Sequence, residues 1–426
     1  MAVLLIIIFI AGYILISFET YLKINKAAIA LFTGILCWIV YIVSNNDIEN
    51  IEPGLSESIS EIAPVIFFLL SAMTIVELID AHNGFDIITK KINQTSKRKL
   101  VWTITLVTFF LSPILDNLTT SIVMVLLLRK LVDNPKQRMV FIGMIIIAAN
   151  AGGVWSPLGD VTTTMLWMGR QVTAENILLK LFLPSLACVI APLIICTFKM
   201  HGHVRTPVQT ISSNKRQFNI KHQYIVLISG LVILLSVPVL KMLTGLPPYM
   251  SILFGLGVLW IITEIIHIKK PDEEKNELTV ANALSRIDSP SILFFLGLLL
   301  GVAALQAAGI LQLTANWLDH TIANENIIVV LIGLLSSVVD NVPLVAAAQA
   351  MYGLDKFSTD HNFWLLLTYC CGTGGSILLI GSAAGVAAMG MEKLSFIWYL
   401  KKISFLAVIG FFSGIIIYFL QQLFIN

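Results

Sequence analysis

The chain has 426 residues, of which 57% are hydrophobic and 12% are charged, and its mean hydropathy is +0.89. A soluble domain of this length needs far less apolar surface, so the composition indicates a polytopic membrane protein. The formal net charge of +2 is small, so the positions of the charged residues are more informative than their sum. The sequence contains no nucleotide-binding loop, and we expect no ATP, no cofactor and no nucleic-acid partner.

Eight uninterrupted apolar runs are long enough to cross about 30 Å of hydrocarbon. The first starts at the beginning of the chain without a basic segment before it, so we expect a membrane span and not a removable signal. The predicted spans cover 2–18, 27–43, 62–81, 177–198, 222–242, 249–267, 289–313 and 403–424.

Two further apolar segments, 101–128 and 327–352, are each divided by a polar turn with an Asp-Asn pair. The pairs begin at Asp116 and Asp340, each four residues after a serine. Arms of roughly 11 residues are too short to span the bilayer. Polar backbone at membrane depth is tolerated only inside protein or beside water. We therefore predict two re-entrant helical hairpins with buried tips.

Segments 139–168 and 363–391 are long enough to span but are interrupted in the middle. Paired glycines lie at both interruptions, beginning at Gly152 and Gly374. Glycine is a poor helix former, so each segment is predicted to be a broken helix that frees backbone groups for a ligand.

The basic residues support one topology, in which the N-terminus is outside and each hairpin returns to its own side. The inner loops then hold 23 of the 27 Lys and Arg residues, which is a strong positive-inside bias. These loops are 19–26, 82–100, 129–138, 199–221, 268–288 and 392–402.

The predicted fold is an all-α polytopic membrane protein with two inverted-topology repeats. Each repeat has five spans, one re-entrant hairpin and one broken helix, and the odd number of spans reverses the second repeat in the membrane. The first repeat covers 1–198, a cytoplasmic linker covers 199–221, and the second repeat covers 222–426. Both chain termini then lie outside.

The hairpin tips and broken helices should meet near the bilayer midplane. Carboxylates in hydrocarbon are costly and therefore indicate function, and hard cations prefer the oxygen ligands gathered here. We predict Na⁺ at Asp116, Asp340 and Asp160, with no basic side chain in the cluster. The oxygen-bearing residues are Asp116, Asn117, Thr119, Thr120, Asn150, Ser156, Asp160, Thr162, Thr163, Thr164, Ser336, Asp340, Asn341, Thr373, Ser376 and Ser382.

These residues predict antiport. A carboxylate buried without a counter-ion can hold a proton or a metal ion, but holds both poorly. Competition between the two at one carboxylate set, joined to alternating access, exchanges Na⁺ for H⁺. Structural roles are open alternatives: Asp116 and Asp340 as helix caps, Asn150 as a partner for loose backbone, and the threonines bonding to their own helix.

A second group of titratable residues lies near the inner end of the third span. Glu77, Asp80 and His82 form either a pH-sensing patch or ordinary interfacial anchors.

Stretches 112–120, 150–163 and 340–347 resemble the NhaD-type bacterial Na⁺/H⁺ antiporters of the ion transporter superfamily, which also includes arsenite and dicarboxylate or citrate carriers. The resemblance covers most of the chain. It implies a homodimer in the bacterial cytoplasmic (inner) membrane, a fixed scaffold, and a transport part that moves as an elevator. It implies exchange of Na⁺ and Li⁺ for H⁺. The cation- and proton-binding residues that it implies are Asp116, Asn117, Thr119, Asn150, Asp160, Thr162, Thr163, Ser336, Asp340, Asn341, Thr373 and Ser376.

Two rival functions remain at this point. A carrier of a small anion or oxyanion, such as a dicarboxylate or arsenite, would use the same scaffold, although a cluster without a base disfavours it. An intramembrane aspartyl protease also needs two acids, but Pro157 stands where its Gly-x-Gly-Asp motif requires glycine. We therefore expect a transporter and not an enzyme.

Overall fold

The computed structural model describes the whole chain except residues 18–22, 45–47, 85–86, 88–95, 205–219, 269–277, 380, 393 and 426. Every regular element in the described part is a helix, and one isolated β-bridge joins Ser96 to His203. The predicted linker 199–221 lies mostly outside the described residues.

Nine helices of the described part are long and apolar enough to cross a membrane. Large apolar side chains such as Phe32, Phe198 and Phe254 are exposed on their outer surfaces, where hydrocarbon can cover them. The chain is therefore a multi-pass membrane protein. The nine helices are α3 (Lys26–Ser44), α4 (Ile48–Ala81), α6 (Lys97–Leu115), α8 (Pro135–Val154), α10 (Ala174–Lys199), α11 (Ile220–Thr244), α12 (Pro248–His267), α15 (Ser289–Ala307) and α22 (Ser404–Ile425).

The remaining helices are shorter, and most of them belong to the interrupted segments. They are α1 (Ala2–Ser17), α7 (Asn117–Leu131), α9 (Val161–Met168), α14 (Val280–Arg286), α16 (Ile310–Ile322), α17 (Glu325–Leu335), α18 (Asn341–Met351), α19 (Asn362–Gly374), α20 (Ala383–Glu392) and α21 (Phe396–Lys402). The two polar turns thus separate α6 from α7 and α17 from α18, and the glycine-rich interruptions separate α8 from α9 and α19 from α20.

The structure differs from the predicted elements in several places. Helix α4 already begins at Ile48, well before the span expected over 62–81. The span expected over 289–313 ends at Ala307, because Gly309 adopts a φ of +71° that breaks the helix. Helix α16 follows and meets α17 at a bend of 117°. In the first hairpin, α6 has 19 residues and continues past Pro113, so this arm is longer than expected and could itself cross the bilayer.

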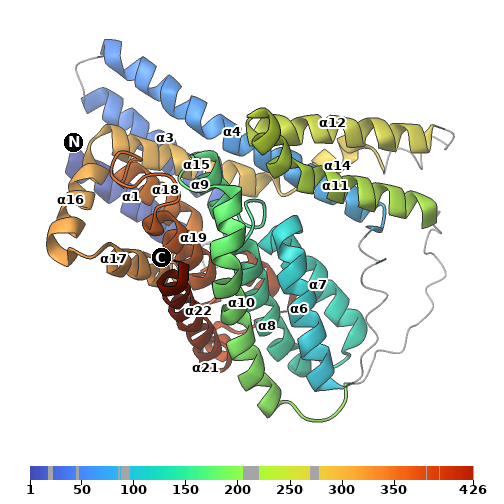
Figure 1. Ribbon diagram of the computed structural model, residues 1–426. Coiled ribbons are helices and arrows are strands. Elements are labelled where there is room, and N and C mark those ends of the chain that lie inside the picture. The colour runs from blue at the N-terminus through green and yellow to red at the C-terminus, as the bar shows by residue number, and fades with distance from the viewer. Residues whose placement is uncertain are drawn as a thin grey trace.

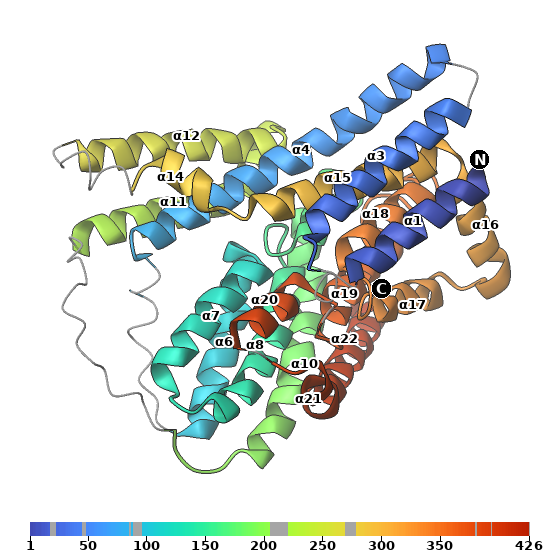
Figure 2. The same ribbon diagram turned by 180° about the vertical axis from the view of Figure 1, so that it is seen from behind.

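The helices form two groups (Figures 1 and 2). In the first group, α3 packs along α15 and α4 along α12, with α1, α11 and α14 beside them. In the second group, α6 packs along α8, α17 along α19, and α10 along α22. Helices α9 and α18 of the second group contact α4 and α15 of the first, so they lie where the two groups meet.

Helices α8 and α19 lie at the centre of the second group. Every residue of α8 from Phe141 to Val154 is buried, as is every residue of α19 from Phe363 to Gly374. Both helices end at the glycine-rich interruptions, so these breaks lie deep inside the protein.

Candidate cation site

Each interruption leaves a helix start that is preceded by a polar residue. Asp116 precedes α7, Asp160 precedes α9, Asp340 precedes α18, and Ser382 precedes α20. The start of a helix carries unpaired N–H groups and a partial positive charge, which favours a carboxylate there.

Asp160 lies at the centre of the polar cluster, and its side chain connects the two Asp-Asn turns. Its Oδ1 accepts a hydrogen bond from Asn117 Nδ2 at 3.3 Å, and its Oδ2 accepts one from Asn341 Nδ2 at 3.0 Å. The hydroxyl of Thr162 also donates to Oδ2 at 2.7 Å. Only 2% of the residue is exposed. A single buried carboxylate is therefore held by residues from three interrupted segments.

Asn150 links this carboxylate cluster to the second broken helix. Its Oδ1 accepts a hydrogen bond from Asn117 Nδ2 at 3.1 Å. Its Nδ2 donates to the hydroxyls of Ser376 and Ser382, both at 2.9 Å. All four polar side chains are buried, so the structure brings together residues from both halves of the chain around Asn150.

The two broken helices carry different residues at matching positions. The glycine spacing that pairs Gly153 with Gly375 also pairs Asn150 with Gly372 and Asp160 with Ser382. A Cβ atom on Gly372 would lie 3.3 Å from Asp160 Oδ2 and would overlap the Val154 side chain. The absence of a side chain at this position makes room for the carboxylate.

Asp116 acts as a helix cap in this structure. Its Oδ1 accepts the backbone N–H of Thr119 at 2.8 Å, and its Oδ2 accepts the Thr119 hydroxyl at 2.8 Å. Its φ of +71° lies in a region that non-glycine residues rarely adopt, a strain on the order of 1–3 kcal/mol. The capping alternative for Asp116 is thus observed, and Thr119 is its partner.

Asp340 has a different partner. Its carboxylate makes no capping hydrogen bond to α18 and instead faces the ammonium group of Lys26, with Oδ2 and Nζ 4.0 Å apart. The sequence pattern predicts Lys26 in an inner loop and no base in the cluster. The expected absence of a base is wrong, because helix α3 brings its first residue to the second Asp-Asn turn.

The remaining predicted residues are mostly engaged with backbone. Ser336 donates to the carbonyl of Cys371 at 2.8 Å, and Thr373 donates to the carbonyl of Tyr369 in its own helix at 2.6 Å. The hydroxyl of Thr163 is buried and has no hydrogen-bond partner among the described residues. Thr163 is therefore a polar group still open to a ligand.

The three acids do not form one shared ligand shell in this conformation. Among the described residues, no three His, Cys, Asp or Glu side chains gather as a metal-binding group. Asp160 is surrounded by amide and hydroxyl groups, Asp116 by Thr119, and Asp340 by Lys26. In this conformation Asp160 is the central carboxylate, and it is held by amide N–H and hydroxyl donors.

The structure gives His82, in the predicted pH-sensing patch, a partner that sequence reasoning did not connect with it. His82 and His267 are both buried, and their Nε2 atoms lie 2.8 Å apart. The other ring nitrogen of His82 bonds the carbonyl of Leu78 at 2.7 Å. Glu77 lies 4.0 Å from Arg286. The His82–His267 pair joins the ends of α4 and α12 and so belongs to the first helix group. Asp160 precedes α9, which belongs to the second group.

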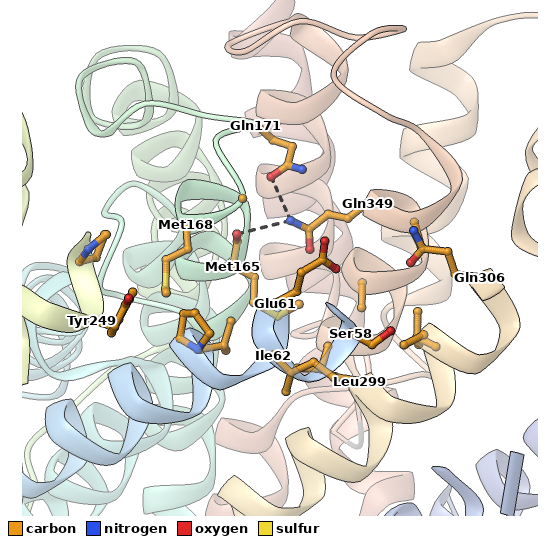
Figure 3. A pocket seen from close by; sticks show the side chains of 18 of the residues that line it. Ser58, Glu61, Ile62, Met165, Met168, Gln171, Tyr249, Leu299, Gln306 and Gln349 are labelled. Carbon is orange, nitrogen blue, oxygen red and sulfur yellow. Dashed lines mark hydrogen bonds between the residues drawn. The ribbon is translucent and has the colours of Figure 1, made fainter. Parts of the chain in front are cut away.

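A cavity of about 460 Å³ lies where the two helix groups meet (Figure 3). Its walls come from α4 and α15 on one side and from α9 and α18 on the other. These last two helices begin at the Asp160 cluster. Of the described residues that line the cavity, only Glu61 is charged, and Gln306 and Gln349 are among the polar ones.

The sequence matches the model of the citrate transporter family over residues 13–360. The chain therefore belongs to this family of membrane transporters.

Several relatives are similar to the chain over nearly its whole length. Sodium/proton antiporter 1 of Arabidopsis thaliana is 48% identical over 97% of this chain and 71% of the relative. Sodium/proton antiporter 2 of the same plant is 46% identical over 97% of this chain and 98% of the relative. The Na⁺/H⁺ antiporter NhaD of Vibrio cholerae is 33% identical over 93% of this chain and 87% of the relative. These matches confirm the resemblance to NhaD-type antiporters.

Proposed function

We propose that the chain is a secondary active transporter that exchanges Na⁺, and also Li⁺, for H⁺ by alternating access. The observation that carries this proposal is the buried Asp160 carboxylate, which is held by the tips of both hairpins. The names of the relatives support the same pair of ions.

The side chains around Asp160 suit either a proton or a metal cation on its carboxylate. In this structure Asn117, Asn341 and Thr162 all donate hydrogen bonds to the carboxylate. A carboxamide carries a carbonyl oxygen beside its NH₂ group, and a hydroxyl has lone pairs, so the same side chains can turn to offer oxygen ligands. Oxygen ligands suit a hard cation. A proton on Asp160 would remove the charge that attracts the cation, so the two ions compete.

Recurring contacts support the proposed inverted repeats. Ser112 donates to the carbonyl of Ala149 at 2.5 Å, and Ser336 donates to that of Cys371 at 2.8 Å. In each half the hairpin serine therefore fastens the helix that precedes the break. Gly153 packs against Gly159, and the matching Gly375 packs against Gly381. The same local construction, used twice around one centre, suits a site that opens to each side of the membrane in turn.

The two helix groups suit the roles of a fixed and a moving part. We assign the scaffold to the group of α3, α4, α12 and α15, and the moving part to the group that carries Asp160. The cavity between α4 and α18 lies on the boundary where such movement would occur. We further propose a homodimer in the cytoplasmic membrane of a bacterium, with both chain termini outside.

Two observations favour the rival function. The family model describes a citrate transporter, and Lys26 near Asp340 is a basic group of the kind that an anion would seek. Asp160, by contrast, is bonded to neutral amides and a hydroxyl, which suit a cation better than a tricarboxylate. The same transport assay decides between the two functions.

The test is proton flux in proteoliposomes when Na⁺, Li⁺, K⁺ or citrate is added outside. We expect Na⁺ and Li⁺ to move protons and citrate to have no effect. In Asp160→Asn we expect Na⁺-driven flux to fall at least about tenfold, because a neutral amide cannot balance the charge of a cation in a dry site.

Asp133→Asn is the matched control, since Asp133 is an exposed residue of the loop between α7 and α8. Its flux should equal that of the wild type. Full activity of Asp160→Asn, or transport of citrate without Na⁺-driven proton flux, would rule out the proposed exchange.

A further inference from the structure

We propose that the ammonium group of Lys26 neutralises the Asp340 carboxylate while the transport site is empty. When Na⁺ binds, it displaces Lys26 from this carboxylate. This inference rests on the proposed function. Lys26 is the first residue of α3, which belongs to the first helix group, whereas Asp340 lies at the tip of the second hairpin. The ion pair therefore connects the proposed scaffold to the proposed moving part.

The pair lies in surroundings that strengthen it. The Lys26 side chain is 22% exposed and that of Asp340 is 19% exposed. The ammonium nitrogen also lies 4.6 Å from the centre of the Phe294 ring, on helix α15. An aromatic face attracts a cation, and two charges that are largely removed from water interact more strongly than a surface pair. Lys26 is thus held between a ring and a carboxylate.

The sequence explains why Asp340 is free for this role while Asp116 is not. Asp116 is bound by the backbone N–H and hydroxyl of Thr119, three residues later. The residue three positions after Asp340 is Pro343, which has no N–H and no hydroxyl. Asp340 makes no capping bond to its own helix, so its charge is directed outward to Lys26.

Competition follows from this placement. One carboxylate cannot fully neutralise both an ammonium group and a Na⁺ ion, and two cations beside it repel each other. Binding of Na⁺ at Asp340 therefore weakens the contact with Lys26. Because that contact joins the two helix groups, loading of the site would release the hairpin tip from α3.

The test is Na⁺-driven proton flux in proteoliposomes over a range of Na⁺ concentrations. Lys26→Met keeps most of the side-chain length and removes the charge. We expect its KM for Na⁺ to fall roughly threefold to tenfold, the range of a partly buried ion pair, with maximal flux retained. Lys26→Arg keeps the charge, and its KM should stay near that of the wild type.

Lys356→Met is the matched control. Lys356 also pairs with an aspartate, Asp319, and lies 4.8 Å from the centre of the Tyr352 ring. Like Lys26 it contacts both a carboxylate and an aromatic ring, but its pair is more exposed and involves neither Asp340 nor Asp160. Its loss should therefore leave the KM for Na⁺ unchanged.

A second measurement separates binding from movement. Na⁺ should raise the thermal denaturation temperature of the detergent-solubilised protein, and in Lys26→Met this rise should begin at a lower Na⁺ concentration. An unchanged or higher KM in Lys26→Met, or folded protein without flux at any Na⁺ concentration, would overturn the competition model. A wild type that exchanges no Na⁺ for H⁺ would instead overturn the proposed function.

Discussion

Asn150 and Gly372 occupy matching positions in the two broken helices and have different structural roles. Asn150 binds Asn117 and the hydroxyls of Ser376 and Ser382, whereas Gly372 has no side chain and leaves space beside Asp160. The half with asparagine therefore supplies the polar link, and the half with glycine accommodates the carboxylate. Only the first broken helix contributes a carboxylate, Asp160, because the matching position of the second carries Ser382.

The space beside Gly372 gives a prediction for Gly372→Ala. The added methyl group would overlap Val154 and press on Asp160 Oδ2. Overpacking of this kind costs about 1–3 kcal/mol, and we expect thermal stability and Na⁺-driven flux both to fall. Gly257→Ala is the control, because nothing lies within 4 Å of a Cβ at that position. Equal melting temperatures for the two variants would contradict the role assigned to Gly372.

At the scale of elements, an ion-pair cluster fastens the end of α20 to the first hairpin and the first broken helix. The Glu392 side chain is only 4% exposed. Its carboxylate pairs with Arg129 of α7 at 2.5 Å and with Arg138 of α8 at 3.0 Å. Arg129 also donates to the carbonyl of Met391. In the sequence these arginines are recognisable only as positive charges of a predicted inner loop, because nothing in the local sequence pairs them with Glu392.

Loss of the Glu392 carboxylate should weaken the attachment of α20 to α7 and α8. In Glu392→Gln two arginines lose their anion, and we expect a loss of about 2–4 kcal/mol in stability, below the cost for a fully buried pair because Arg129 is 40% exposed. Thermal denaturation in detergent measures the loss. Asp319→Asn breaks the more exposed pair with Lys356 and should cost at most about 1 kcal/mol. A smaller effect at Glu392 than at Asp319 would show that the cluster does not hold α20.

For the whole molecule, the boundary between the two helix groups is the place where the proposed movement would occur. The cavity at this boundary is lined by α4 and α15 from one group and by α9 and α18 from the other (Figure 3). Helices α9 and α18 run from the Asp160 cluster to this cavity. If one group slides past the other, the walls of the cavity must separate or close.

A cysteine at the cavity wall tests this movement. In Ala350→Cys we expect a polar thiol reagent to react and then to inhibit Na⁺-driven flux, because Ala350 lines the cavity. Ala148→Cys is the control, since Ala148 is fully buried in α8 and should not react. The five native cysteines are all buried, so their background reaction should be low. Reaction at position 350 without any change in flux would place the moving boundary elsewhere.

Much of the fold was predictable because it depends on local composition. Apolar length located the regular spans, and paired glycines located the breaks after α8 and α19. Prediction was wrong where the local sequence was compatible with more than one backbone conformation. The turn at Gly309 and helix α16 were not expected, and the first arm of the first hairpin was expected to be shorter.

The residues of the candidate site were predictable from the sequence, but their arrangement in space was not. Sequence spacing selected Asn117, Asn150, Asp160 and Asn341, which the structure brings together. It did not reveal that Asp160 occupies the centre.

The sequence by itself determined that this is a multi-pass helical membrane protein with polar interruptions, because hydrophobic length and helix breaking are properties of neighbouring residues. Only the tertiary structure decided which acid lies at the centre, that Lys26 faces Asp340, and that His82 meets His267. These are contacts between residues far apart in the chain, so they depend on how helices pack. Helix packing is set by the shape of whole surfaces, which no single stretch of sequence contains.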